Sequence, residues 1–304
     1  MPFLELSLTV RADQQQRIET ALEDLGALSI TLQDADADTP DERAIFEPGV
    51  GETPLWNTVV LQALFDAGID RAGLIAALTD FAPELSPEHL AFRDVADQDW
   101  TRAWMDTFQP MRFGQRLWIY PWNVEPTADA GDDAVIVRLD PGLAFGTGTH
   151  PTTAMCLEWL DAADLAGKTV IDYGCGSGVL AIAALKLGAA RVIGVDNDAQ
   201  ALVASRANAE RNGVGDRLDL YTPEALPPDR VGVLVANILA GPLHELAPRF
   251  AALLAAGGAL ALSGILREQA SELLARYGAW FEQLESSARE DWVRLAGIRK
   301  LNAS

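Results

Sequence analysis

Residues that crosslink a chain or bind a metal are scarce in this sequence. Its 304 residues include two cysteines, Cys156 and Cys175, and three histidines, His89, His150 and His244. Two cysteines do not make a disulfide framework in a chain of this size. The histidines are scattered without the ligand spacing of a zinc site. We therefore expect a protein of a reducing compartment that holds no metal.

Long hydrophobic runs are also missing. The longest, from Phe250 to Leu262, has 13 residues and contains two glycines, whereas a helix that crosses a bilayer needs about 20 apolar residues. The N-terminal residues, Met1 to Leu6, lack the basic region of a secretory signal peptide. These absences predict a cytoplasmic protein without a membrane segment.

Positive charge is the third scarcity. The chain has 23 lysines and arginines against 44 aspartates and glutamates, a net charge of −21. Residues 1–100 hold 5 basic and 20 acidic side chains and no lysine, while residues 101–304 hold 18 and 24. Such a surface repels phosphate backbones, which argues against a broad nucleic-acid interface. It is compatible with a basic protein partner, and equally with a surface that only keeps the protein in solution.

The first hundred residues carry their own pattern of strands and helices. Apolar, β-prone runs predict strands over Phe3–Val10, Ala27–Gln33, Thr58–Phe65 and His89–Val95. Helical spacing of leucine and isoleucine predicts one helix between the first two strands, capped by Asp13 and ended by Gly26, and another, capped by Asp70, between the last two. The order β-α-β-β-α-β is typical of a ferredoxin-like α+β domain.

A connecting segment follows this domain. Trp100, Trp104 and Phe108 recur every four residues, which predicts a helix over Asp97–Phe108 with one aromatic face. We expect that face to pack against a neighbouring domain, with a hinge or partner-binding role as the alternative. The chain is therefore divided into a domain of residues 1–96, a connecting helix of residues 97–109 and a domain of residues 110–304.

Strands and helices alternate through most of the second domain. Two short strands come first, and five more alternate with helices. The last two strands have no helix between them, which favours a hairpin. The simplest architecture is a parallel α/β sheet closed by an antiparallel hairpin. The predicted strands are Leu117–Tyr120, Val135–Leu139, Thr169–Tyr173, Arg191–Asp196, Leu218–Tyr221, Val231–Ala236, Ala259–Ser263, Trp280–Leu284 and Trp292–Ile298.

A glycine-rich loop joins the strand that ends at Tyr173 to the following helix. Gly174, Gly176 and Gly178 allow a ligand to approach the backbone closely at the start of that helix. The dinucleotide-binding pattern requires a further glycine where this chain has Val179. Asp172, just before the loop, would also repel a pyrophosphate. Its carboxylate instead favours a ligand with a positively charged centre.

Asp196 ends the next predicted strand, 22 residues after Gly174. A carboxylate at about this spacing typically accepts hydrogen bonds from the hydroxyl groups of a ribose. A ribose and a positive centre without a phosphate describe S-adenosyl-L-methionine. The alternative is a surface carboxylate in a strand–helix loop. Within the glycine loop, Cys175 is expected to be a packing residue, because no histidine is near it in sequence.

Two further segments are candidates for the same site. Asn237 follows the fourth strand of this sheet, where open α/β sheets bind ligands, and its carbonyl can accept a hydrogen bond from a substrate amine. Helix capping before Pro242 is the alternative. The segment Leu139–Thr153 has three glycines and four threonines around Phe145, a composition that can fold closely round a ligand. Within it, His150 is either a base or a structural residue.

Together these residues resemble class I S-adenosylmethionine-dependent methyltransferases, because Asp172–Gly178 matches their first motif and Asp196 their ribose-binding acid. Over essentially its whole length, the chain is similar to the family of bacterial ribosomal protein L11 methyltransferases. The most specific segments are Gly146–Thr153 and Asn237–Leu239. The full set that carries the resemblance is Phe46–Pro48, Pro110–Gly114, Leu139–Thr153, Asp172–Gly178, Ala199–Gly213, Asn237–Pro242 and Ser263–Leu266.

The resemblance implies a seven-stranded, doubly wound, Rossmann-like methyltransferase sheet with a smaller N-terminal α+β ferredoxin-like domain. It implies that the N-terminal domain recognises a basic large-subunit ribosomal protein, and that the C-terminal domain methylates lysine side-chain and N-terminal amines with S-adenosyl-L-methionine and no metal. Asn237 is the expected catalytic residue. The expected donor-binding residues are Phe145, Thr147, Thr153, Asp172, Gly174, Gly176, Gly178, Asp196 and Asn237.

One departure from related enzymes leaves part of the site open. Many amine methyltransferases have Asn-Pro-Pro-aromatic where this chain has Asn237-Ile238-Leu239-Ala240, and nothing in the sequence identifies a dedicated base. Two other functions are compatible with the pattern. The first is an amine methyltransferase that acts on another protein or a small molecule. The second is a non-catalytic acidic binder of basic proteins, against which the intact Asp172, Asp196 and Asn237 argue.

Overall fold

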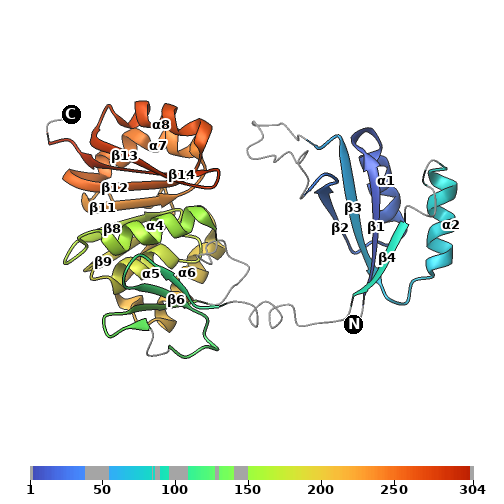
Figure 1. Ribbon diagram of the computed structural model, residues 1–304, viewed down its shortest axis with the longest axis horizontal. Coiled ribbons are helices and arrows are strands. Elements are labelled where there is room, and N and C mark those ends of the chain that lie inside the picture. Colours follow the sequence, from blue (N-terminus) through green and yellow to red (C-terminus); the bar gives the residue numbers. More distant parts are fainter. Residues whose placement is uncertain are drawn as a thin grey trace. The chain divides into compact units, whose positions relative to one another are not determined.

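The computed structural model of the chain describes residues 3–37, 55–83, 85, 90–95, 109–126, 130–139 and 150–301 (Figure 1). The chain divides into two compact units, Met1–Asp99 and Trp100–Ser304. The connecting helix predicted over Asp97–Phe108 lies outside the described residues. Among the helices in the described ranges, none is long and apolar enough to cross a membrane.

The N-terminal unit is a four-stranded sheet with two helices. Its strands lie in the order β2-β3-β1-β4, and all neighbours are antiparallel. Leu4, Leu6 and Leu8 on β1 are buried against Ile18 and Leu22 of α1, which explains the alternation in the sequence. All four predicted strands and both predicted helices are present. Their bounds are β1 (Phe3–Arg11), α1 (Ala12–Asp24), β2 (Ser29–Asp34), β3 (Thr58–Asp66), α2 (Arg71–Phe81) and β4 (Leu90–Val95). Asp70 caps α2 as predicted. The cap predicted for α1 is wrong, because the helix begins at Ala12, with Arg11 as its N-cap and Asp13 inside its first turn.

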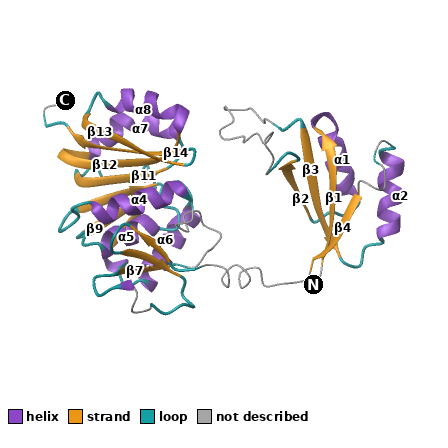
Figure 2. Cartoon of the chain, in the orientation of Figure 1, coloured by secondary structure: helices purple, strands orange, loops and turns teal. Residues whose placement is uncertain are grey.

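The C-terminal unit is built on a mixed seven-stranded sheet (Figure 2). The strands lie in the order β10-β9-β8-β11-β12-β14-β13; the first five are parallel, and β14 is antiparallel to both of its neighbours. The predicted closing hairpin is thus confirmed. The strands of the seven-stranded sheet are β8 (Thr169–Tyr173), β9 (Arg191–Val195), β10 (Leu218–Tyr221), β11 (Val231–Asn237), β12 (Leu254–Leu266), β13 (Phe281–Arg289) and β14 (Trp292–Arg299).

Helices cover both faces of this sheet. On β11, Val233 and Val235 pack with α4, α5 and α6, while Leu234 and Ala236 pack with α7 and α8. Burial on both faces explains why this strand reads as a continuous apolar run. The helices are α4 (Pro151–Ala162), α5 (Val179–Lys186), α6 (Ala199–Arg211), α7 (Ala240–Leu253) and α8 (Ala270–Tyr277), with short 3-10 helices at Gly215–Arg217 and Arg267–Gln269.

A small sheet precedes α4 in the same unit. The two predicted short strands are present as β6 (Leu117–Tyr120) and β7 (Val135–Arg138), which pair in parallel, and β5 (Met111–Phe113) joins them as an unpredicted third strand. The carboxylate of Asp161, near the end of α4, accepts a hydrogen bond from the Gln115 N–H at 2.6 Å. This contact fixes the turn between β5 and β6 to the helix.

The strand order positions the candidate site. In the sheet, β9 lies on one side of β8 and β11 lies on the other side of β8. At such a point the loops that leave two adjacent parallel strands run in opposite directions and leave a crevice at the carboxyl ends of the strands. The glycine loop follows β8, Asp196 follows β9 and Asn237 ends β11, so all three lie at that crevice.

Candidate functional site

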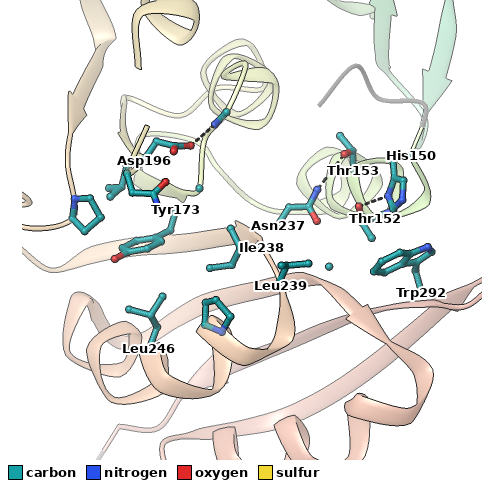
Figure 3. Close-up of a pocket in the computed structure, with 17 residues that line it drawn as sticks. His150, Thr152, Thr153, Tyr173, Asp196, Asn237, Ile238, Leu239, Leu246 and Trp292 are labelled. Carbon is teal, nitrogen blue, oxygen red and sulfur yellow. Dashed lines mark hydrogen bonds between the residues drawn. The ribbon is translucent and has the colours of Figure 1, made fainter. Parts of the chain in front are cut away.

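A cavity of about 710 Å³ lies at the carboxyl ends of the central strands (Figure 3). This volume is in the range of sites that bind a small molecule or cofactor. In the view of Figure 3, Asp196 lies at one side, His150 and Trp292 lie at the other, and Asn237 lies between them. The lining residues are His150, Thr152, Thr153, Tyr173, Gly174, Gly176, Val195, Asp196, Asn197, Pro223, Asn237, Ile238, Leu239, Pro242, Leu246, Gly264 and Trp292.

The glycine loop adopts a backbone that other residues rarely adopt. Gly174, Gly176 and Gly178 have φ angles of 81°, 53° and 80°, in the left-handed region that favours glycine. A Cβ on Gly174 would also collide with the side chain of Ile238. Gly174 and Gly176 line the cavity, whereas Gly178 is the N-cap of α5. The loop is thus both conformationally special and closely packed.

Asp196 is fixed against the glycine loop. Its Oδ2 accepts a hydrogen bond from the Gly176 N–H at 2.8 Å, and its Oδ1 accepts one from the Asp198 N–H at 3.0 Å. The cap of α6 is Asp198, whose side chain accepts from the Gln200 N–H. Each carboxylate oxygen of Asp196 has a further lone pair, so the group can still accept hydrogen bonds from a ligand in the cavity.

The structure places Asp172 beneath the glycine loop and not in the cavity, which differs from the sequence expectation. Its side chain is fully buried, and its Oδ2 accepts a hydrogen bond from the Ala181 N–H in the first turn of α5 at 2.9 Å. Burial raises the pKa of Asp172 to about 7; the hydrogen bond from Ala181 opposes this shift and the charge on Asp196 adds to it. Asp172 therefore holds the first turn of α5, the helix that follows the glycine loop.

Asn237 lines the cavity at the end of β11. Its Nδ2 donates a hydrogen bond to the Thr153 Oγ1 at 3.1 Å (Figure 3). No other hydrogen bond engages the Asn237 side chain within the described residues, so its Oδ1 is left as an acceptor. The competing interpretation, a cap for the following helix, is not what the structure shows, because the N-cap of α7 is Leu239.

His150 and Trp292 form an aromatic corner of the cavity. Their rings meet edge to face, with centroids 5.0 Å apart. His150 is also the N-cap of α4, and its Nδ1 lies 2.7 Å from the Thr152 Oγ1. Burial lowers the pKa of His150, and nearby Glu290 opposes the shift. His150 therefore has a structural role as a cap, and its ring is mainly neutral at neutral pH.

Neither cysteine is placed for nucleophilic chemistry. Cys156 and Cys175 are free and buried, and burial raises the pKa of each thiol to about 12. Both are therefore packing residues, as expected for Cys175. A group of three or more histidine, cysteine, aspartate or glutamate side chains able to hold a metal ion is absent from the described part of the chain.

The structure brings together most of the predicted site residues and adds others. Thr153, Gly174, Gly176, Asp196 and Asn237 share the cavity. Phe145 and Thr147 lie outside the described residues and stay predictions. The sequence analysis did not single out Tyr173, Pro223, Leu246 and Trp292, which also line the cavity. Nothing in their spacing indicates this position, because Pro223 follows β10 and Leu246 is on α7.

The arrangement suits the transfer of a group between two bound molecules. One side has a fixed carboxylate beside a glycine loop, which is suited to the hydroxyl groups of a sugar. The middle has the amide oxygen of Asn237 as an acceptor. Apolar side chains of Ile238, Leu239 and Trp292 also line the cavity, with Ile238 packed against Gly174 of the glycine loop. Among the described residues, both cysteines are buried and His150 is hydrogen-bonded to Thr152, so this part of the lining offers no activated nucleophile and suits direct displacement between bound molecules.

Comparison with known proteins gives a consistent family. The family model described as "Ribosomal protein L11 methyltransferase (PrmA)" matches residues 2–300. The protein named ribosomal protein L11 methyltransferase of Stenotrophomonas maltophilia (strain R551-3) is 59% identical over 305 residues, which cover 99% of this chain and 100% of the relative. The protein of the same name from Xanthomonas axonopodis pv. citri (strain 306) is 54% identical with the same coverage.

A solved structure supports the same assignment. The ribosomal protein L11 methylase of Lactobacillus delbrueckii subsp. bulgaricus superposes with a TM-score of 0.57 at 32% sequence identity. The superposition covers 64% of this chain and 98% of that chain. The α/β fold of the C-terminal unit is therefore a methyltransferase fold.

Proposed function

The chain belongs to the ribosomal protein L11 methyltransferase family, and we propose that it transfers methyl groups from S-adenosyl-L-methionine to amines of the large-subunit ribosomal protein L11. The acceptors are lysine side chains and the N-terminal amine. The observation that carries the proposal is the full-length identity of 59% to a relative of that name. The cavity supports it, because Asp196 and Asn237 line the same space.

The residues of the cavity fit the proposed donor. Asp196 retains lone pairs for the two ribose hydroxyls, and its carboxylate disfavours a phosphate at the same place. Apolar contacts from Tyr173, Pro223 and Leu246 fit an adenine base, and Thr153 and Asn237 provide polar groups for the remainder. When bound, S-adenosyl-L-methionine would supply an electrophilic methyl group: the amine nitrogen would form a bond to the methyl carbon as the sulfur–methyl bond breaks, with S-adenosyl-L-homocysteine as the leaving group.

Asn237 orients the acceptor amine. Because its Nδ2 is held by Thr153 at 3.1 Å, its Oδ1 faces the cavity as a fixed acceptor for an amine N–H. A hydrogen bond there aims the amine lone pair at the methyl carbon, and most of the rate enhancement then comes from alignment. Besides its contact with the donor, Thr153 positions Asn237 in this scheme through their hydrogen bond.

The walls of the cavity favour the uncharged amine. A lysine amine has a pKa of about 10.4 and an N-terminal amine about 7.7–8.0, and only the neutral form can attack. The amine must pass Ile238, Leu239 and Trp292, and their apolar surfaces lower its pKa by removing water. Solvent at the exposed edge of the cavity, where Leu239 is 50% exposed, accepts the proton.

The N-terminal unit is the proposed recognition domain. We assign it a ferredoxin-like fold from its element order and from the sheet order β2-β3-β1-β4. Residues 1–100 hold 20 acidic and 5 basic side chains, which suits a basic ribosomal protein as partner and does not suit direct binding of nucleic acid. We also propose a cytoplasmic location, where ribosomal proteins are made.

Two assays test the proposal together. Calorimetry should detect binding of S-adenosyl-L-homocysteine and no binding of NAD at the same concentration. Radiolabelled methyl groups should then pass from the donor to purified ribosomal protein L11, and not to an unrelated protein of similar size and basic charge. Donor binding without transfer to ribosomal protein L11 would contradict the proposed target, and absence of donor binding would contradict the proposed chemistry.

A further inference from the structure

Helix α6 and its C-cap carry three polar side chains in a row. Ser205 and Asn208 are on α6 and Asn212 is its C-cap; because they are separated by three and four residues, they lie on one side of the helix. Ser205 is fully buried, and the other two are half-buried. We call these three residues the α6 polar stripe. None of them lines the cavity.

Two members of the stripe hold carbonyl groups of the glycine loop. The Ser205 Oγ donates a hydrogen bond to the Gly176 carbonyl at 2.9 Å, and the Asn208 Nδ2 donates one to the Ser177 carbonyl at 2.9 Å. A Cβ on Gly178 would lie 2.9 Å from the Ser205 Oγ. The helix and the loop are therefore in direct contact, and two consecutive peptide groups of the loop are fixed by α6.

Gly176 is held from both sides. Its carbonyl accepts from Ser205, and its N–H donates to the Asp196 carboxylate at 2.8 Å. A loop with three glycines has much conformational freedom to lose, and a ligand that had to order it would bind more weakly. The α6 polar stripe and Asp196 together remove that freedom before a ligand arrives.

The third member of the stripe holds the end of β7. The Asn212 Oδ1 accepts from the Arg138 N–H at 2.9 Å, and its Nδ2 donates to the Arg138 carbonyl at 2.8 Å. One asparagine thus satisfies both peptide groups of the last residue of β7. Arg138 directly precedes Leu139–Thr153, the segment that holds Thr153 and the predicted donor-binding residues Phe145 and Thr147.

We propose that the α6 polar stripe is a positioning device for methyl-donor binding. It holds the glycine loop and the end of β7 at a fixed separation, so that the loop has its ligand-binding conformation before the donor binds. This inference rests on the proposed function, because it assumes that the glycine loop binds the donor. It assigns a role to Ser205, Asn208 and Asn212, none of which lines the cavity.

The test compares substitutions on two sides of the same helix. Asn208→Ala removes the hydrogen bond to the loop. Arg206→Ala is the matched control, because Arg206 is also half-buried on α6 and donates to the backbone carbonyls of Gly215 and Leu218, each at 2.8 Å and away from the loop. Affinity for S-adenosyl-L-homocysteine is measured by calorimetry, together with the melting temperature and the KM values for the donor and for ribosomal protein L11.

We expect Asn208→Ala to weaken S-adenosyl-L-homocysteine binding about five- to tenfold, which corresponds to the loss of one hydrogen bond. The KM for the donor should rise with it, while the KM for ribosomal protein L11 stays within about twofold. Arg206→Ala should lower the melting temperature and leave the affinity for S-adenosyl-L-homocysteine within about twofold of the parent value. Ser205→Ala, which removes a single oxygen, should behave like Asn208→Ala and serves if the latter does not fold.

Three results would overturn the inference or its premise. Unchanged donor affinity in folded Asn208→Ala and Ser205→Ala would show that the stripe is only structural. An equal loss of affinity in Arg206→Ala would assign the effect to general stability of α6. Failure of the parent protein to bind S-adenosyl-L-homocysteine at all would instead contradict the proposed function, so the two failures are distinguishable.

Discussion

Replacing the buried carboxylate Asp172 with asparagine should change how the stability of the protein depends on pH. The Asp172 Oδ2 accepts from the Ala181 N–H at 2.9 Å, while its Oδ1 has no hydrogen-bond partner among the described residues. Asparagine can keep the first contact through its carbonyl. Its amide nitrogen would take the place of the unpartnered oxygen, which costs roughly 1–3 kcal/mol at every pH.

The magnitude follows from the shift in the pKa of Asp172, from 3.8 to about 7. Between these values the folded protein holds a proton that the unfolded chain releases, so the stability contributed by this group falls as the pH rises. The full difference corresponds to roughly 4 kcal/mol. Of this, roughly 2–3 kcal/mol should be lost between about pH 5 and about pH 8 in the parent and not in Asp172→Asn.

Urea unfolding of both proteins at about pH 5 and about pH 8 measures this difference. The transition of the C-terminal unit can be identified because a saturating donor shifts it. Relative to the parent, Asp172→Asn should become more stable by roughly 2–3 kcal/mol on going from the lower to the higher pH. A difference between the two proteins that stays constant with pH would show that Asp172 is not protonated in the folded state at the lower pH, and the reasoning from burial would be refuted.

Three further predictions concern the proposed activity. Asp196→Ala should weaken donor binding about a hundredfold or more, because two charge-assisted hydrogen bonds of roughly 1.5–3 kcal/mol each are lost; calorimetry on the folded variant checks this, and unchanged affinity contradicts the ribose assignment. Asn237→Ala should lower turnover at least about tenfold with a smaller effect on donor affinity; turnover within about twofold of the parent would remove its role in aiming the amine. Residues 101–304 alone should bind the donor and lose most methylation of ribosomal protein L11, and methylation by the full chain should fall as salt rises; full activity of the shorter chain would place recognition in the C-terminal unit.

The strands and helices could be predicted because the spacing of apolar residues in the sequence matches the spacing of the side chains that are buried. The continuous apolar run of β11 is buried on both faces, and the alternation on β1 buries Leu4, Leu6 and Leu8 on one face only. β5, three residues long, carries too few residues to show a period. β13 extends beyond its predicted end because the residues after Leu284 still pair with β14. β12 begins earlier than predicted, with Leu254 paired to Val231 of β11, and its end pairs with β14 as far as Leu266.

The parts of the site that could be predicted are those where the backbone conformation or the end of a strand determines which residue type is present. Three glycines with positive φ mark the loop, and Asp196 and Asn237 end parallel strands beside it. The direction of a side chain is not visible, which is why Asp172 was expected at the ligand and lies beneath the loop instead. Trp292 follows a hairpin turn and reaches the cavity only through the antiparallel pairing of β14 with β12.

Methylation of the proposed target is tested most directly by the intact mass of purified ribosomal protein L11 after incubation with the full chain and S-adenosyl-L-methionine. We predict that the mass rises in whole steps of one CH2, and only when donor and enzyme are both present. Peptide fragmentation should assign every step to a lysine side chain or to the N-terminal amine. An unchanged mass, with enzyme that binds the donor by calorimetry, would contradict this prediction.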